Sequence, residues 1–253
     1  MSHLMGPLTS RDVKDQARKI GFHLVGITTV ERLKDLPRGN VHGVKQLIGA
    51  ADELPTAKSA IILAFHIWDP IFNVMVSEPG WRGYGMHPPD ENFSMYQLYS
   101  EIVRGKAGQL VDYLREQGFQ AKVARGIPLK PAAVIAGLGC RGKNTILVTP
   151  QYGSRVRLAA VLTSAELEPD EPFREDLCRS CERCIAACPT KALKPYDITI
   201  SRCLTYAAES PESPDVPTDV RELERKLIRR PTPNSFIECT ICIDACPIGR
   251  ETK

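Results

Sequence analysis

Apolar residues recur along this chain at spacings that predict alternating helices and strands. Residues 10–20 carry apolar side chains on one helical face, with Ser10 as the predicted cap, and a longer amphipathic helix is predicted from Ser94 to Gly118. The β-branched apolar run at residues 59–66 predicts a buried strand. Further strands are predicted at residues 22–27, 119–124, 145–148 and 156–162, and further helices at residues 44–47 and 131–136. Because helices and strands alternate through the first two thirds of the chain, this part is predicted to be an α/β domain.

A long segment between the buried strand at residues 59–66 and the helix predicted from Ser94 lacks this periodicity. Residues 68–92 are rich in proline and glycine and also carry Trp81, Tyr84 and His87. Loops of this length inside a domain are usually functional or disordered. The aromatic content favours a lid over a ligand, with plain packing as the alternative.

The composition changes at residues 167–172, a polar stretch with two prolines that is typical of a linker. It predicts a boundary between a first domain, residues 1–166, and a cysteine-rich second domain, residues 167–253. Within the second domain, residues 207–235 combine prolines with a charged helical segment. This segment is predicted to be an insertion that forms a surface excursion.

Composition and charge exclude several classes of protein. Of 253 residues, 43% are hydrophobic and 25% charged, which is ordinary for a globular protein. No apolar run approaches the roughly 18 residues that span a membrane, and the N-terminus lacks the features of a secretion signal. We therefore expect a cytoplasmic protein with no membrane partner. The net charge is only +3 and basic residues are scattered, so we expect no DNA partner.

Eight of the nine cysteines lie in the last third, mostly in two runs that each end in Cys-Pro. The first run reads C-x-x-C-x-x-C-x-x-x-C-P, the bacterial ferredoxin spacing for a 4Fe-4S cluster. In two-cluster ferredoxins the fourth cysteine of such a run ligates the other cluster. The predicted ligands are Cys178, Cys181, Cys184 and Cys246 for the first cluster, and Cys188, Cys203, Cys239 and Cys242 for the second.

Two other uses of paired cysteines remain open. Cys-x-x-Cys pairs also build zinc ribbons, and disulfide frameworks stabilise small secreted domains. The ferredoxin spacing is more specific than a cysteine pair alone, and the chain is neither small nor marked for secretion. The double cluster, and with it electron transfer, is therefore the favoured interpretation.

A glycine-rich stretch, Gly137-Leu-Gly-Cys-Arg-Gly-Lys-Asn144, matches the dinucleotide-binding pattern letter for letter and the P-loop pattern nearly. The dinucleotide pattern G-x-G-x-x-G requires a helix after it, whereas a strand is predicted here. The P-loop pattern requires a hydroxyl residue where Asn144 stands. We expect neither site. The three glycines allow the backbone to approach a ligand closely, with a plain tight turn as the alternative.

The remaining chemistry-bearing residues give weaker signals. Cys140 is expected to lie away from the cluster ligands, as a small buried residue or a reactive thiol. The five histidines are dispersed and no pair has metal-ligand spacing. No catalytic residue is assigned.

The glycine-rich stretch, the segment Pro150-Gln-Tyr-Gly-Ser154 and the double cysteine array together resemble epoxyqueuosine reductase and the reductive dehalogenases. The resemblance covers most of the chain. It implies a fold of the α+β or α/β class, in which a nitroreductase-like cobalamin-binding domain precedes a two-cluster ferredoxin-like domain. It also implies cobalamin beside the two 4Fe-4S clusters. The residues that match the family's corrinoid loop are Gly137, Gly139, Gly142, Lys143 and Asn144.

Two features of epoxyqueuosine reductase are not matched. Its Asp-Thr-Gly-Pro motif, whose aspartate is the proposed proton donor, is replaced by residues 124–130, which contain no acid. Its helical repeat, which helps to hold tRNA, has no counterpart after Cys246. We therefore expect tRNA not to be a partner and the substrate to be an unidentified small molecule or protein. Arg125 or Lys130 would stabilise negative charge or supply a proton, or else are surface residues.

The predicted function is that of an iron–sulfur oxidoreductase. A donor such as ferredoxin or flavodoxin would pass electrons through the two clusters to bound cobalamin, which would reduce the substrate. The alternative is an electron-transfer protein that acts on a protein partner without a corrinoid of its own.

Overall fold

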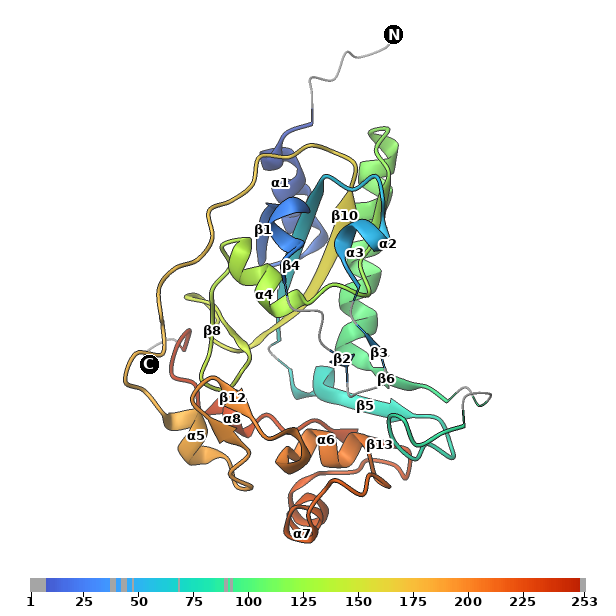
Figure 1. The fold of residues 1–253 in the computed structure, drawn as a ribbon, viewed down its shortest axis with the longest axis vertical. Coiled ribbons are helices and arrows are strands. Elements are labelled where there is room, and N and C mark those ends of the chain that lie inside the picture. Colours follow the sequence, from blue (N-terminus) through green and yellow to red (C-terminus); the bar gives the residue numbers. More distant parts are fainter. Residues whose placement is uncertain are drawn as a thin grey trace.

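A four-stranded antiparallel sheet lies at the centre of the first part of the chain, in the order β1–β4–β10–β7 (Figure 1). The computed structural model describes residues 8–36, 40–41, 45–46, 48–67, 69–88, 91 and 93–250. The strands of the sheet are β1 (Leu24–Thr29), β4 (Ser59–His66), β7 (Ala121–Val123) and β10 (Val156–Thr163). β4 occupies the predicted position and is buried along almost its whole length.

Helices cover both faces of this sheet because successive side chains of a strand point to opposite sides. The odd-numbered residues of β4 pack with α1 (Ser10–Ile20) and α3 (Leu98–Glu116). The even-numbered residues pack with α4 (Leu129–Ile135) and the 3-10 helix η1 (Glu31–Leu33). This second contact fixes α4, and therefore the glycine-rich stretch that follows it, against the sheet.

Several predicted boundaries are wrong for local reasons. Thr9, rather than Ser10, caps α1, because its hydroxyl accepts the Asp12 N–H at 3.2 Å. Ser94 does not cap α3, since β6 (Met95–Gln97) intervenes and pairs with β5 (Val74–Ser77). The helix predicted at residues 44–47 is wrong where it is described, because Lys45–Gln46 forms strand β3, which pairs with β2 (Asn40–Val41); residues 44 and 47 lie outside the described residues.

A second core joins elements of the first part of the chain to elements of the cysteine-rich part. The three-stranded sheet β13–β5–β6 pairs β13 (Ser235–Ile237) with β5, and α6 (Leu204–Glu209) and α7 (Thr218–Leu227) pack against it. Val220 and Ile228 are buried in this core. Residues 207–235 are therefore not a surface excursion, because one face of α7 completes a hydrophobic core.

An extended segment connects β10 to the cysteine-rich part and runs along one side of the molecule (Figure 1). The Asp170 carboxylate, within this segment, accepts the Ile27 N–H at 2.7 Å and pairs with Lys14. The segment contains the predicted linker. The division into two domains at residue 166 stays a prediction, and the β13–β5 pairing shows that the two parts share a sheet.

The cysteine-rich part consists of short elements. They are α5 (Arg183–Ala187), β11 (Leu193–Lys194), β12 (Asp197–Ile198), η3 (Ile200–Arg202) and α8 (Ile241–Asp244). The first part also contains α2 (Ala50–Glu53), η2 (Pro70–Asn73), β8 (Cys140–Arg141) and β9 (Leu147–Val148). Among the described residues, no helix has the length and apolar character required to cross a membrane.

Candidate iron–sulfur and cofactor site

The cysteines of the array form two groups of four, each around its own hollow. The first cysteine group consists of Cys178, Cys181, Cys184 and Cys246. The second cysteine group consists of Cys188, Cys203, Cys239 and Cys242. All eight thiols are free of disulfides. The grouping is the same as the one the spacing predicts, and each group draws on both runs of the sequence.

Short helices and backbone N–H groups hold the two groups in place. α5 and α8 pack together and carry Cys184 and Cys242. The Lys143 N–H donates to Cys178 Sγ at 3.5 Å, and the Ala192 N–H donates to Cys188 Sγ at 3.4 Å. Hydrogen bonds of this kind to cluster sulfurs are one of the means by which a protein sets a cluster potential.

The thiols of the second cysteine group lie close enough to interact with one another. Burial raises the pKa of Cys239 to about 11, and burial together with the neighbouring thiols raises the pKa of Cys242 to about 12. Metal binding to such thiols must release their protons. Among the described residues, no three Cys, His, Asp or Glu side chains are close enough to share one metal ion. Four thiols around one hollow are the donor set that a 4Fe-4S cluster requires.

Cys140 lies beside the first cysteine group, which contradicts the expectation that it is remote from the cluster ligands. It is buried in a small cluster with Val148 and Cys246, against which Cys178 packs. Its sulfur accepts the Leu177 N–H at 3.4 Å, and burial raises the pKa of its thiol. The local sequence gave no sign of this, because the hairpin β8–β9 brings Cys140 to the array.

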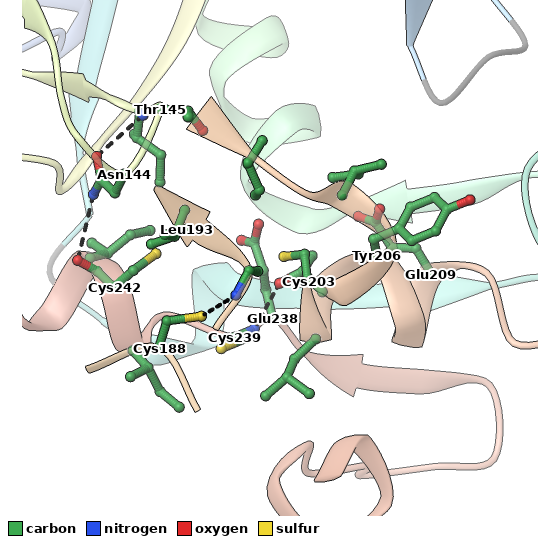
Figure 2. Close-up of a pocket in the computed structure, with 18 of the residues that line it drawn as sticks. Asn144, Thr145, Cys188, Leu193, Cys203, Tyr206, Glu209, Glu238, Cys239 and Cys242 are labelled. Carbon is green, nitrogen blue, oxygen red and sulfur yellow. Dashed lines mark hydrogen bonds between the residues drawn. The ribbon is translucent and has the colours of Figure 1, made fainter. Parts of the chain in front are cut away.

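The hollow around the second cysteine group is part of a cavity of about 440 Å³ (Figure 2), so a cluster held there would fill part of this volume. Its volume is in the range of small-molecule and cofactor sites. Most of its wall is apolar and comes from separate elements, through residues such as Leu129, Ile146, Leu158, Leu193 and Ile200. A group bound in this cavity would lie next to a cluster held by the second cysteine group.

One wall of the cavity is polar. The Arg157 guanidinium forms an ion pair with Glu238 and stacks on the Tyr99 ring, 4.1 Å from its centroid. Glu209 and Lys130 also line the cavity. Burial, followed by the nearby arginines, lowers the pKa of Lys130. No motif marks these residues in the sequence, because folding brings them together from five segments.

The end of the glycine-rich stretch contacts both cysteine groups, through Lys143 to Cys178 and through Asn144 to Cys242. The chain itself accounts for its glycines, since a Cβ at Gly137 would stand 2.6 Å from Glu171 O and one at Gly139 would stand 2.1 Å from Val148 O. A Cβ at Gly142 would stand 2.6 Å from the Asn144 side chain. As predicted, no helix follows the stretch; the hairpin β8–β9 is formed instead.

The five residues predicted to face a corrinoid are placed differently from one another. Asn144 lines the cavity and donates to Cys242 O at 3.5 Å. Lys143 is buried, with its ammonium 3.5 Å from the Glu182 carboxylate. The three glycines do not line the cavity. Corrinoid binding by these five residues stays a prediction.

The aromatic segment predicted as a lid does not cover the cavity. None of the described residues from 69 to 93 lines it. Instead, the Trp81 indole N–H donates to the Glu209 carbonyl at 2.7 Å, and Arg82 pairs with Glu212. The segment packs against the end of α6, which is the alternative considered for it. Arg125 also lies outside the cavity lining, whereas Lys130 is part of it.

Comparison with known proteins finds a double-cluster domain and similar epoxyqueuosine reductases. A family model described as a 4Fe-4S double cluster binding domain matches residues 177–249. The epoxyqueuosine reductase of Cyclobacterium marinum is 37% identical over 262 residues, covering 95% of this chain and 79% of that protein. The epoxyqueuosine reductase of Gloeobacter violaceus is 27% identical over 265 residues, covering 95% of this chain and 76% of that protein.

Solved structures show the same fold. An epoxyqueuosine reductase from Bacillus subtilis superposes with a TM-score of 0.67 at 23% identity, covering 96% of this chain and 66% of that one. A reductive dehalogenase superposes with a TM-score of 0.57 over 88% of this chain and 35% of that one. The predicted fold class is confirmed. The protein is an iron–sulfur oxidoreductase with a double 4Fe-4S cluster domain. The chain belongs to the epoxyqueuosine reductase family, as the resemblance predicted.

One expectation about partners is overturned. A solved neighbour, with a TM-score of 0.67 at 22% identity, is an epoxyqueuosine reductase in complex with an epoxyqueuosine-modified tRNA-Tyr stem loop. The expectation that tRNA is not a partner is therefore wrong. It was inferred from an absent motif and an absent repeat, and neither absence excludes RNA from the rest of the surface. The chain spans 66% of the length of that structure.

Proposed function

We propose that this protein passes electrons from a donor of the ferredoxin or flavodoxin type through its two clusters to a corrinoid. The corrinoid would occupy the part of the 440 Å³ cavity that the second cluster leaves free, and the substrate would be an epoxide such as epoxyqueuosine in a tRNA stem loop. The proposal depends chiefly on one observation. The second cysteine group forms part of the cavity lining, so a cluster there adjoins whatever fills the cavity.

We expect the residues that line the cavity to hold the corrinoid, because the glycines of the predicted loop do not reach it. A corrinoid has a broad apolar ring, and the cavity offers apolar side chains on several sides, including Leu129, Ile146 and Leu158, with Asn144 as a polar contact. When bound, it would supply a low-potential metal centre that transfers electrons to the substrate. The apolar walls exclude water, which strengthens electrostatic interactions inside. Lys130, from the start of α4, would stabilise negative charge on the reacting oxygen.

A second candidate function is electron transfer to a protein partner without a bound corrinoid. One observation favours it: the glycines of the family's corrinoid loop are explained by contacts within the chain. In that case the two clusters alone suffice, and the cavity would be filled by the partner.

Substrate conversion separates the two candidates. The anaerobic protein with both clusters, a chemical reductant, cobalamin and an epoxyqueuosine-modified tRNA stem loop is expected to yield the queuosine form. Nucleoside mass spectrometry measures this conversion, with cobalamin omitted from the control. Protein with full cluster content that converts none of the stem loop in the presence of cobalamin would contradict the proposal.

A further inference from the structure

Reduction of an epoxide to an alkene consumes two electrons and two protons. One C–O bond breaks and the oxygen takes a proton to become a hydroxyl group. The second C–O bond then breaks, the carbon–carbon double bond forms, and the hydroxyl leaves as water with the second proton. The donor supplies both electrons through the clusters. Since residues 124–130 contain no acid, the first proton must come from elsewhere in the largely apolar cavity.

Two carboxyl groups line the cavity, among the described residues: Glu209 and Glu238. Glu238 forms the ion pair with Arg157 and directly precedes a cysteine of the second cysteine group. Its carboxyl oxygen accepts a hydrogen bond from the Arg157 guanidinium, although burial raises its pKa. Glu209 is the last residue of α6, is only 3% exposed and receives a hydrogen bond from Gln97.

The groups around Glu209 favour its neutral, protonated form. Burial, followed by the negative charge of Glu238, raises the pKa of Glu209 to about 8, against the smaller effects of Gln97 and Arg157. The other titratable groups with which it interacts are Tyr84, Tyr99 and Cys203. Arg157 cannot neutralise both carboxylates. Lys130, the other cation of the cavity wall, acts on Glu238, whereas Arg157 is the cation that acts on Glu209.

The surroundings also fix the position of Glu209. The Trp81 indole holds its carbonyl at 2.7 Å. The Arg221 guanidinium donates to the carbonyls of Ala207 and Ser210, on either side of it along the helix end. These contacts hold the backbone at and around Glu209, whose side chain lines the cavity (Figure 2).

We propose that Glu209 is the catalytic proton donor of the reduction, a role that the family assigns to an aspartate this chain lacks. Its carboxyl gives the first proton to the epoxide oxygen as the C–O bond breaks. Water supplies the second proton and later returns one to Glu209. This assignment rests on the proposed function.

The test compares Glu209→Gln with Glu212→Gln. Glu212 is a partly exposed carboxylate that pairs with Arg82 outside the cavity, so its variant is expected to convert the stem loop at the wild-type rate. Glu209→Gln keeps the shape and loses the proton, so conversion is expected to fall by about 10² to 10⁴-fold at unchanged iron content and cobalamin uptake.

Wild-type conversion is expected to decline as pH rises through about 8. Glu209→Asp is expected to retain this pH dependence at a lower rate.

A second readout does not depend on turnover. A carboxyl group whose pKa rises from 4.5 to about 8 on folding stabilises the fold below pH 4.5, and this contribution is lost as pH rises to about 8. The anaerobic thermal midpoint of the wild type should therefore fall relative to that of Glu209→Gln over this interval. If the difference between the two thermal midpoints did not change with pH, the proposal would be overturned.

The conversion assay distinguishes a failure of the Glu209 assignment from a failure of the proposed function. Equal conversion by the wild type and Glu209→Gln overturns the assignment of Glu209 and leaves the proposed function intact. No conversion by the wild type overturns the proposed function, and the assignment with it.

Discussion

Replacing Cys246 by alanine is expected to remove the first cluster, although Cys246 belongs to the second run of the sequence. It lines the same hollow as Cys178, Cys181 and Cys184. Cys188→Ala is expected to remove the second cluster, because Cys188 lies with Cys203, Cys239 and Cys242. A cubane has four iron atoms, so each variant should fall from about eight to about four irons per chain. Only the loss of the second cluster should isolate the cavity from electrons while the first cluster remains reducible.

Iron and sulfide analysis, with electron paramagnetic resonance of the reduced variants, measures this result. Cys140→Ala is the matched control. Its thiol lies beside the first cysteine group and is the ninth cysteine, so both clusters should remain. A further variant, Cys242→Ala, should remove the second cluster, although Cys242 and Cys246 belong to the same run of the sequence. If Cys246→Ala and Cys242→Ala removed the same cluster, the grouping of Cys246 with the first run would be wrong.

Gly139→Ala is expected to destabilise the protein by about 3 kcal/mol or more. The added Cβ would stand 2.1 Å from the Val148 carbonyl oxygen and 2.9 Å from its carbon. Both are backbone atoms of the β8–β9 hairpin, so relief requires the hairpin to open. The hairpin also carries Cys140 and leads to Lys143, which contact the first cysteine group. The first cluster should therefore be lost more readily on heating.

Gly105→Ala, in α3, is the control for this change. A Cβ there meets nothing within 4 Å, and alanine in a helix interior is about 0.5–1 kcal/mol more favourable than glycine. The anaerobic thermal midpoint should rise for Gly105→Ala and fall for Gly139→Ala. An unchanged midpoint for Gly139→Ala would mean that the hairpin does not pack as described.

The cysteine grouping was predictable because ferredoxin spacing is a local pattern with a definite geometric consequence. The strand at residues 59–66 was predictable for a similar reason, since a short continuous apolar run suits a strand buried on both faces. The role of the glycines was not predictable. Glycine permits close approach to a ligand or to the chain, and only the fold shows that Val148 and Glu171 are the neighbours.

The polar wall of the cavity could not be predicted either. Glu209 and Glu238 are ordinary in the sequence, and their chemistry comes from burial beside Arg157. That burial depends on the pairing of β13 with β5, which joins residues about 160 positions apart. The sequence cannot show the packing of the segment around Trp81 either, because its partner is the end of α6, far along the chain.

An anaerobic titration with cobalamin, followed by the ultraviolet–visible spectrum, tests whether the second cluster passes electrons to a bound corrinoid. Protein with both clusters reduced is expected to bind one equivalent of cobalamin. The cobalamin bands should change as the clusters are reoxidised, and Cys188→Ala should bind cobalamin without this electron transfer. A protein that holds its full complement of iron and sulfide, yet neither retains nor reduces cobalamin, would contradict the account.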